Sequence, residues 1–281
     1  MRFTEPIGIL ATATLALSLV LPATALENDP GLPVESFSGA SLATLNIPVA
    51  RARMSPELAL AEYESHARWQ SQQIGESFDT TTITADLPDA AKHGQYRLKR
   101  VFMAPKSVAF KTIDFIGDGF VKTNVIARLL QSETDHVQKD PPQNTAITRQ
   151  NYKFNYKGTE QVNGRTAHVF QVKPREKRAG LFKGRIYIDV YSGNMLRAEG
   201  RVVKSPSFFI KKIDFVQDYA EVGDFNLISR IHSVAETRLI GRAVVDIRHD
   251  NYQVLSLTQV QASEYSPGKL VRTAFSQSNA R

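Results

Sequence analysis

Residues 184–203, GRIYIDVYSGNMLRAEGRVV, decide the fold that the sequence predicts. Apolar residues occupy every second position of the first half, as at Ile186 and Ile188, and charged or hydroxyl-bearing residues lie between them. After a turn at Ser192-Gly193-Asn194 the alternation resumes, with Leu196 and Ala198 between basic and acidic residues. A period of two is typical of a half-buried strand, so this stretch predicts an antiparallel hairpin with one apolar and one charged face.

The same alternation extends over the second half of the chain. Ala243, Val245 and Ile247 share one face of a later strand, and Asn163-Gly164 is a strong signal for a tight hairpin turn. Short turns join successive strands, so we expect neighbouring strands to pair in sequence order as a meander. Together with the strands predicted near 79–87, 95–103 and 108–116, this gives about nine long strands.

Two helices are predicted to cover the apolar face. The first begins at Ser55-Pro56-Glu57, where Ser is a good cap and Pro fits the first helical position, and the second spans 121–138. The fold class is therefore a β-rich α+β protein, a large curved antiparallel sheet covered on its concave face by two helices. Two helices cover little of so large a sheet, and small residues such as Ala198 and Gly200 would leave room. Either a filled core or a hydrophobic cavity between sheet and helices fits this pattern.

The stretch 204–216, KSPSFFIKKIDFV, predicts a turn followed by a strand that begins at Phe208. Adjacent rings in one strand point to opposite faces. One of Phe208 and Phe209 would then face inward, and the other would cover an edge, contact a loop or stand at a cavity rim. The sequence does not decide which of the two faces in.

The N-terminal residues predict export. A basic residue, an apolar run over 7–21 and the small-x-small site Ala23-Thr24-Ala25 are typical of a signal peptide cleaved near Ala25. The chain has no cysteine, which favours a bacterial periplasm over a disulfide-rich setting. We expect a signal peptide at 1–25, a leader at 26–54, one domain at 55–254 and a polar C-terminal tail at 255–281.

Motifs for catalysis, cofactors and metals are not found in the sequence. It contains no G-x-S-x-G elbow, P-loop or H-E-x-x-H pair, and its six histidines form no tight cluster. His232 and His249 are expected on neighbouring strands, where an exposed charge lattice is favoured over a metal site. We therefore predict no catalytic residue, no metal and no cofactor, and we expect a protein that is not an enzyme.

The chain has a net charge of +7, and its basic residues are concentrated in the segment 173–185. Six basic residues form this basic cluster: Lys173, Arg175, Lys177, Arg178, Lys183 and Arg185. One interpretation is a solvated hairpin end. The other is a docking surface for anionic lipid headgroups or an acidic, membrane-bound partner. Nucleic acid is not expected, because no nucleic-acid-binding motif accompanies the charge.

Several stretches resemble the LolA-like superfamily of periplasmic proteins, which includes outer-membrane lipoprotein-sorting proteins. They are the helix SPELALAEYESHARW, the helix VKTNVIARLLQSETDHV and above all GLFKGRIYIDV with the following KSPSFFIKKIDF, which is similar to an uncharacterised branch. The resemblance spans about residues 55–254. It implies an unclosed β-barrel with a helical lid and an apolar cavity that carries lipoprotein acyl chains or other lipids. No functional residue is carried over from the superfamily, and the chain is longer than its typical carriers.

The prediction from the sequence is thus a periplasmic carrier that binds lipid or lipidated cargo in a hydrophobic cavity. The ten residues expected to face the cargo are Ile186, Ile188, Leu196, Ala198, Ile210, Ala243, Val245 and Ile247 from the sheet, with Leu129 and Leu130 from the second helix. Two alternatives remain open. One is a protein-binding regulatory or scaffold protein of the same fold, and the other is a hydrolase with an unrecognised site, in which two or three polar groups converge inside the cavity.

Overall fold

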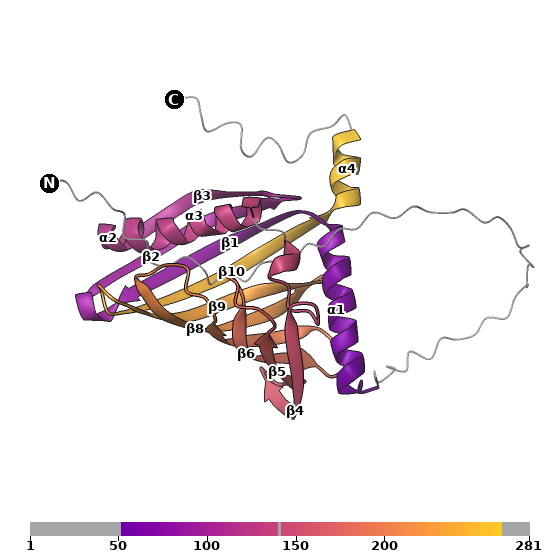
Figure 1. Ribbon diagram of the computed structural model, residues 1–281. Helices are drawn as coiled ribbons and strands as arrows, with labels where there is room; N and C mark the ends of the chain where they lie inside the picture. The colour runs from indigo at the N-terminus through magenta and orange to yellow at the C-terminus, as the bar shows by residue number, and fades with distance from the viewer. Residues whose placement is uncertain (1–51, 140–141, 266–281) are drawn as a thin grey trace, which may run out of the picture.

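The computed structural model describes residues 52–139 and 142–265, and it is dominated by one antiparallel sheet (Figure 1). Ten strands make up the sheet: β1 (Ile74–Leu87), β2 (Lys92–Met103), β3 (Ser107–Gly117), β4 (Tyr152–Val162), β5 (Arg165–Pro174), β6 (Phe182–Asp189), β7 (Met195–Val202), β8 (Ile210–Val222), β9 (Phe225–Thr237) and β10 (Arg242–Ser256). Their order is β3-β2-β1-β10-β9-β8-β7-β6-β5-β4. The two outermost strands do not pair with each other, so the curled sheet is an unclosed barrel, as predicted.

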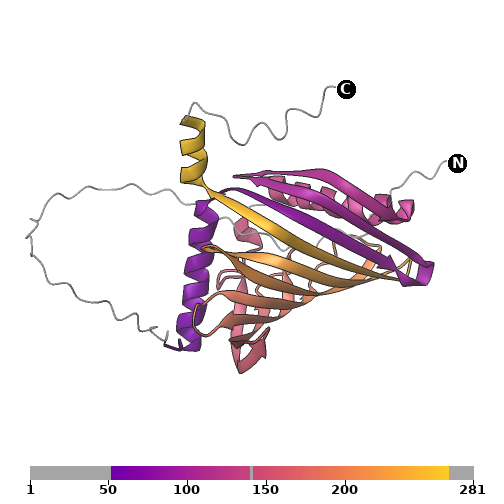
Figure 2. The ribbon, with the colours of Figure 1, turned by 180° about the vertical axis from the view of Figure 1, so that it is seen from behind.

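Strands β4 to β10 follow one another as the predicted meander, and only one pairing joins segments far apart in sequence. β1 pairs with β10 along most of its length, from Ile74 with Ser256 to Asp86 with Val244. This pairing joins the β1–β3 part of the sheet to the meander, and Figure 2 shows the two strands side by side from behind.

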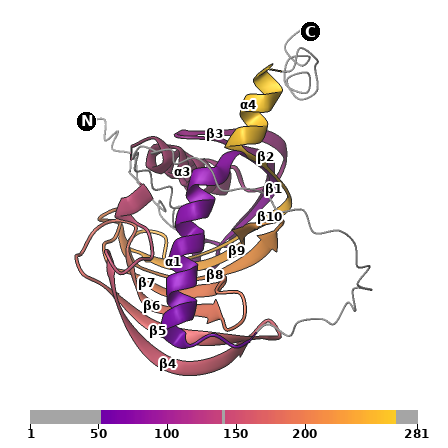
Figure 3. The same cartoon turned by 90° about the vertical axis from the view of Figure 1, so that its right-hand side faces the viewer.

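The helices lie on the concave side and at one end of the sheet. Helix α1 (Pro56–Gln73) crosses the strand ends, as Figure 3 shows, and begins at Ser55, whose side chain accepts a hydrogen bond from the Leu58 amide. A second helical segment runs along the concave face as α2 (Gly119–Val121), the π-helical η2 (Lys122–Ile126) and α3 (Ala127–Lys139). Three short turns or helices complete the description: η1 (Pro88–Ala90), η3 (Pro142–Asn144) and α4 (Leu257–Tyr265).

Two separate core clusters fill the concave side. In the first, Val125, Ile126 and Leu129 of the second helical segment pack on inner residues of β1, β8, β9 and β10. In the second, Ala59 and Leu60 of α1 pack on inner residues of β4 to β8. Because each helical segment covers one half of the sheet, both predicted helices are needed to bury its apolar face.

The convex face is a lattice of paired charges, as the alternation predicts. Neighbouring strands contribute opposite charges at facing positions, which stabilises cross-strand pairs. Four of these facing pairs are Arg185–Glu199, Arg197–Asp218, Arg201–Asp214 and Lys212–Glu236, and Arg230 contacts Asp246 diagonally across the β9–β10 ladder. His232 joins this lattice through Asp246, at 3.3 Å.

The small residues on β6 and β7 do not create space, contrary to the expectation for Gly200. Gly200 lies opposite Gly184 in the β6–β7 ladder. A Cβ on Gly184 would lie 2.6 Å from the Gly200 Cα and would clash with the carbonyl oxygen of Glu199. Glycine is therefore required here because the two backbones approach closely, and no void results.

The strand predicted to begin at Phe208 begins two residues later, at Ile210. Phe208 and Phe209 belong to the loop after β7, where Phe208 is 77 % exposed and Phe209 is half-buried. The Ser205 hydroxyl donates to the carbonyl oxygens of Ser207 and Ile210, which holds this loop in a tight bend. The adjacent rings therefore need not occupy opposite sheet faces, and the first inward residue is Ile210.

The first residues of the C-terminal tail expected at 255–281 belong to a strand and a helix. β10 continues to Ser256, and α4 follows directly. Ser256 and Gln259 form a capping box, because each side chain accepts a hydrogen bond from the other residue's amide. The predicted signal peptide and nearly all of the predicted leader lie outside the described residues. Among the described helices, none is both long and apolar enough to span a bilayer.

Candidate functional site

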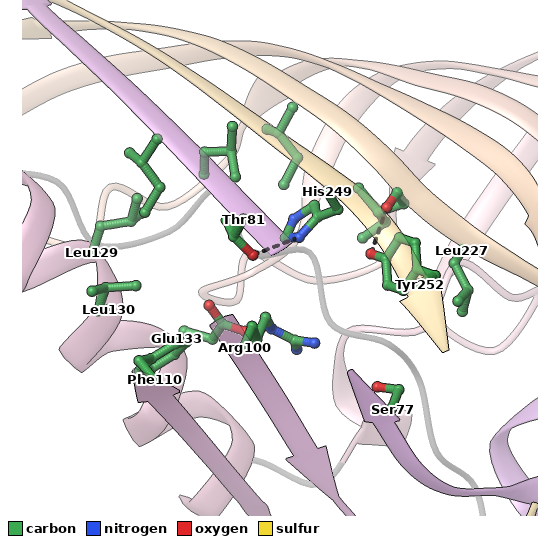
Figure 4. Close-up of a pocket in the computed structure, with 14 residues that line it drawn as sticks. Ser77, Thr81, Arg100, Phe110, Leu129, Leu130, Glu133, Leu227, His249 and Tyr252 are labelled. Carbon is green, nitrogen blue, oxygen red and sulfur yellow. Dashed lines mark hydrogen bonds and ion pairs between the residues drawn. The ribbon is translucent and has the colours of Figure 1, made fainter. Parts of the chain in front are cut away.

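A cavity that is partly open to solvent lies between α3 and the inner faces of five strands (Figure 4). Its volume is about 60 Å³. Most of its wall is apolar, and these lining residues are Ile83, Phe110, Leu129, Leu130, Leu227, Ile228, Ile231 and Ile247. The remaining lining residues are polar and gather toward one end: Ser77, Thr81, Arg100, Glu133, His249 and Tyr252. The cavity thus has an apolar body and a polar end.

This division arises from strand β1, whose odd-numbered residues all face inward and are buried. After Gly75, the next three of them are polar and the last three are apolar: Ser77, Asp79, Thr81, then Ile83, Ala85, Leu87. The neighbouring strands β10 and β2 also place polar residues beside the polar part of β1. His249 continues the inner face of Ala243, Val245 and Ile247 on β10, and Arg100 lies beside Asp79 in the β1–β2 register.

Asp79 is the centre of a buried polar network, and its side chain is fully shielded from solvent. Its Oδ1 accepts hydrogen bonds from Thr81 Oγ1 at 2.5 Å and from His249 Nδ1 at 3.0 Å. The nearby Tyr252 hydroxyl donates to the Ile228 carbonyl oxygen at 2.7 Å. A carboxylate is buried only where such donors surround it, so these hydrogen bonds are what allow Asp79 to lie in the interior.

Arg100 connects this network to α3. Its Nε donates to Glu133 Oε1 of α3 at 2.6 Å, and its Nη1 lies 3.4 Å from Asp79 Oδ2. The Arg100 and Glu133 side chains are only 15 % and 11 % exposed. Arg100 is thus a charged tether between the sheet and the helix that closes the cavity, and we call Arg100 with Glu133 the α3 tether.

The pKa values of Asp79, Arg100 and Tyr252 are shifted by burial and by the charges of the network. Burial alone would raise the pKa of Asp79, but the hydrogen bond from His249 and the charges of His249 and Arg100 outweigh it and hold that pKa below its ordinary value. For Arg100, burial favours the neutral form, but Glu133 and Asp79 raise its pKa further above the ordinary value. Burial also raises the pKa of Tyr252, so its phenol stays protonated. At neutral pH the cluster therefore contains ionised carboxylate and guanidinium groups.

Polar groups do converge inside the cavity, as the hydrolase alternative requires, but their geometry does not form a catalytic relay. A histidine base needs one nitrogen for the nucleophile and the other for the orienting acid. Here Thr81 and Asp79 both approach His249 Nδ1, at 3.1 and 3.0 Å, and Thr81 directs its proton to Asp79. Within the described part of the chain, no group of three or more His, Asp or Glu side chains is placed to hold a metal ion.

The predicted cargo-facing residues do not all lie together. Leu129, Leu130 and Ile247 line the cavity. Ile210, Ala243 and Val245 are buried in the same core cluster nearby, whereas Ile186, Ile188 and Ala198 lie in the cluster under α1. The structure therefore brings three of the ten to the cavity, places six in the two cores and puts Leu196 in a third cluster.

Leu196 lies on the opposite face of the sheet from its predicted neighbours. A bulge shifts the β6–β7 register, so that Ile188 faces Met195 while Tyr187 still faces Arg197. Met195 therefore takes the inward position, and Leu196 packs with Val162, Ala167, Val169 and Tyr187 in a separate cluster. An extra residue in one strand reverses the direction of the side chains that follow it, which strict alternation does not anticipate.

The basic cluster divides into two groups. Arg185 belongs to the convex lattice through Glu199 and Glu160, and Arg178 contacts Asn151 and Glu176. Arg175 donates to the Arg149 carbonyl oxygen, and Lys173, Lys177 and Lys183 are exposed. The latter four lie at or beside the β5–β6 turn.

Two wider clefts open at the surface. One, of about 370 Å³, lies beside Trp69 and the β8–β9 turn, and the other, of about 240 Å³, lies between α1 and residues 143–150. Trp69 stacks with His66 and with Phe225, at ring-centroid distances of 5.4 and 5.6 Å, and it is still 39 % exposed. We take the α3 cavity, where apolar walls meet buried charges, as the candidate site.

The buried charges escaped the sequence analysis, although a signal was present. His249 has the same parity as Ala243, Val245 and Ile247, so it should have been assigned to the inner face and not to the exposed lattice. Asp79 and Thr81 have the parity of the inward Ile83. Polar residues that continue an apolar face of a strand are the pattern that would have identified the network.

The Asp79 network predicts loss of stability in acid. Because the folded-state pKa of Asp79 is lowered, its contribution is fully present above the unfolded value near pH ~4 and is lost as pH falls through the folded value. Asp79→Asn should cost about 1–3 kcal/mol at pH 7, and this deficit should shrink as the pH falls below about 4. Urea unfolding at a series of pH values measures it. Asp114→Asn, in a half-exposed pair with Arg97, is the control, and an equal pH-dependent deficit there would refute the assignment.

Residues 144–243 match a family described as a family of unknown function (DUF5686). No curated protein matches.

Three solved structures are similar to this chain at low identity. A DUF1329 family protein from Desulfovibrio piger is 11 % identical with a TM-score of 0.36, over 72 % of this chain and 93 % of that one. A LolA superfamily protein from Nitrosomonas europaea is 10 % identical with a TM-score of 0.37, over 73 % and 95 %. A putative outer membrane lipoprotein-sorting protein domain from Vibrio parahaemolyticus is 13 % identical with a TM-score of 0.35, over 70 % and 89 %.

Proposed function

We propose that this chain is a periplasmic carrier that binds a lipid, or the acyl chain of a lipidated protein, without catalysing a reaction on it. The observation that supports this function best is the cavity beneath α3, with its apolar body and polar end. An amphiphile has the same division. Its hydrocarbon would lie between α3 and the sheet, and its head group would lie near Arg100, His249 and Tyr252.

The cavity must widen to accept such cargo. A cavity of about 150 Å³ holds one benzene molecule, whereas this one measures about 60 Å³. Each buried methylene contributes about 0.8 kcal/mol, so an acyl chain of ordinary length supplies on the order of 10 kcal/mol toward displacing α3. The carrier function therefore requires α3 to move away from β9 and β10 when cargo enters.

Two features make α3 suited to such movement. The helix is interrupted at η2, and π-helical turns are frequent at functional sites. One polar contact between α3 and the sheet is the α3 tether, which is charged and lies at the polar end of the cavity. Breaking and remaking that contact would open and close the helix over cargo.

A buried amide near the cavity is also consistent with cargo. Gln217 on β8 is fully buried, and neither atom of its side-chain amide has a hydrogen-bond partner among the described residues. It lies beside Ile231, which lines the cavity, and beside Ala198 of the cluster under α1. Leaving such a group unpaired costs about 1–3 kcal/mol, which a carbonyl or amide of the cargo would recover.

Binding of cis-parinaric acid, a fluorescent fatty acid, to the full chain tests the carrier. We expect saturable binding that Leu130→Phe weakens at least about tenfold, or 1.4 kcal/mol, because the larger ring occupies the cavity. Leu58→Phe makes the same change at a residue 55 % exposed at the start of α1, and it should leave the affinity unchanged. Equal effects of the two substitutions, or no saturable binding at all, would exclude the cavity as the cargo site.

Native mass spectrometry of periplasmic protein separates the alternatives. Co-purifying lipid supports the carrier, and a stoichiometric protein adduct without lipid supports the scaffold alternative. A lipid that leaves in hydrolysed form after incubation would support the hydrolase.

A further inference from the structure

One end of the sheet carries exposed apolar side chains among unpaired cations. The antiparallel order places the β5–β6, β7–β8 and β9–β10 connections at the same end, over residues 175–181, 203–209 and 238–241. Backbone hydrogen bonds join them in turn, from the Val203 amide to the Leu181 carbonyl and from the Arg238 amide to the Phe209 carbonyl. We call these three connections, with Lys173, Lys183 and Arg242 at the adjoining strand ends, the turn rim.

Two apolar side chains project from the turn rim. Phe208 is 77 % exposed, and Leu239 on the neighbouring connection is 56 % exposed. The Phe208 ring is held in place by its neighbours: the Arg238 guanidinium lies 4.6 Å from its centroid, and the Phe209 ring meets it edge-on at 5.9 Å. Arg238 Nε also donates to the Phe208 carbonyl oxygen at 2.9 Å. The aromatic ring is therefore held in an exposed position, where it does not contribute to the hydrophobic core.

The charges of the turn rim differ from those of the convex face. On the convex face, arginines contact carboxylates across the strands. On the turn rim, seven cations have no carboxylate within ion-pair distance among the described residues: Lys173, Arg175, Lys177, Lys183, Lys204, Arg238 and Arg242. The acids nearby are Glu176, which contacts Arg178, Asp89, which accepts from the Arg242 amide, and Glu236, which lies opposite Arg242 but pairs with Lys212. The turn rim is thus strongly positive, whereas the arginines of the convex face are paired with carboxylates.

We propose that the turn rim docks reversibly on the surface of an anionic phospholipid bilayer. Phe208 and Leu239 would enter the headgroup region, and the surrounding lysines and arginines would contact lipid phosphates. A bilayer fits better than an acidic protein because the apolar groups protrude from loop tips, and no cavity described above lies in the turn rim to receive a partner's side chains. Ile240 packs on the core cluster under α3, so a docked turn rim adjoins the half of the sheet that holds the cavity. Docking goes beyond cargo binding and does not depend on it.

Site-specific labelling tests the docking, since the cysteine-free sequence gives one attachment point for each introduced cysteine. Phe208→Cys, Leu239→Cys and Leu58→Cys are each labelled with an environment-sensitive nitrobenzoxadiazole dye in the full chain. Leu58 is the matched control, because it is as exposed as Leu239 but lies at the start of α1, beside the β6–β7 turn at the opposite end of the sheet. The probe is a vesicle of phosphatidylcholine and phosphatidylglycerol, compared with phosphatidylcholine alone.

We expect a several-fold rise in emission with a blue shift at positions 208 and 239 on mixed vesicles only, abolished by high salt, and no change at position 58.

Co-sedimentation of unlabelled Lys204→Gln/Arg242→Gln with the mixed vesicles should fall several-fold. The control Lys99→Gln/Lys157→Gln, whose lysines are exposed on β2 and β4, should sediment as the unchanged chain does. Unchanged emission of the labels at 208 and 239, or an equal change in emission at 58, would overturn the proposal. So would a response to an acidic protein with none to vesicles. Because parinaric acid binding is measured separately, a failed carrier and a failed docking surface give different results.

Discussion

Replacing Arg100 by Met is expected to destabilise the folded chain by about 3–5 kcal/mol, because it leaves two buried carboxylates without their common cation. Glu133 and Asp79 contact the same guanidinium, and both carboxylates are almost completely shielded. Methionine fills part of the arginine volume, so the loss reports the missing charge more than a missing contact. Urea unfolding at neutral pH, followed by circular dichroism, measures it.

Arg97→Met is the matched control for this prediction. Arg97 lies on the same strand and pairs with Asp114, but the two side chains are 50 % and 41 % exposed. Exposed pairs contribute at most about 1 kcal/mol, so this variant should remain close to the unchanged chain. The double variant Arg100→Met/Glu133→Met should recover part of the loss, since it removes one of the unpaired charges. Equal losses for Arg100→Met and Arg97→Met would show that the α3 tether is not a buried pair.

Gly184→Ala should have the second largest effect, a loss of about 2–3 kcal/mol. The added methyl would meet the backbone of β7 at the Glu199 carbonyl and the Gly200 Cα, and backbone atoms cannot move aside as a flexible side chain does. The strands would have to separate where Gly184 and Gly200 face each other, and the cross-strand hydrogen bonds around them would lengthen. The midpoint of urea unfolding measures the loss.

Gly119→Ala provides the comparison for this glycine. A Cβ at Gly119 meets no atom within 4 Å, and the residue begins α2. This substitution should be neutral or stabilise the chain by up to about 1 kcal/mol, because alanine loses less backbone entropy on folding. If both alanine variants unfold at the same denaturant concentration, the close approach of β6 and β7 is not what requires Gly184.

The parts of the fold that followed from the sequence are those governed by one repeated physical rule. The one-sided alternation on β6, β7 and β10 predicted a sheet with a charged convex face, and Ser55-Pro56 predicted the start of α1. The parts that did not follow depend on single residues or distant pairings. The bulge at Leu196, the capping box at Ser256 and the β1–β10 pairing each depend on a local or distant partner that a periodic pattern does not contain.

The candidate site illustrates the same limit. Three of the apolar residues predicted to face the cargo, Leu129, Leu130 and Ile247, line the cavity, whereas Leu196 lies on the opposite face of the sheet. The residues that give the cavity its chemistry are Asp79, Arg100 and Glu133, which come from β1, β2 and α3 and meet only in the folded chain. In the sequence each reads as a surface charge, because a charged residue is exposed unless a partner accompanies it into the interior.

The pairing of β1 with β10 also limits the order in which the chain can fold as it emerges, N-terminus first, into the compartment where it folds. Strands β4 to β9 contact their neighbours in sequence, so this meander can form early from local hairpins. Strands β1 to β3 and α3 emerge first but cannot join the meander until residues 242–256 have also emerged. The half that contains the cavity is therefore completed last, and its apolar inner face stays exposed throughout that interval, when it would most need a chaperone.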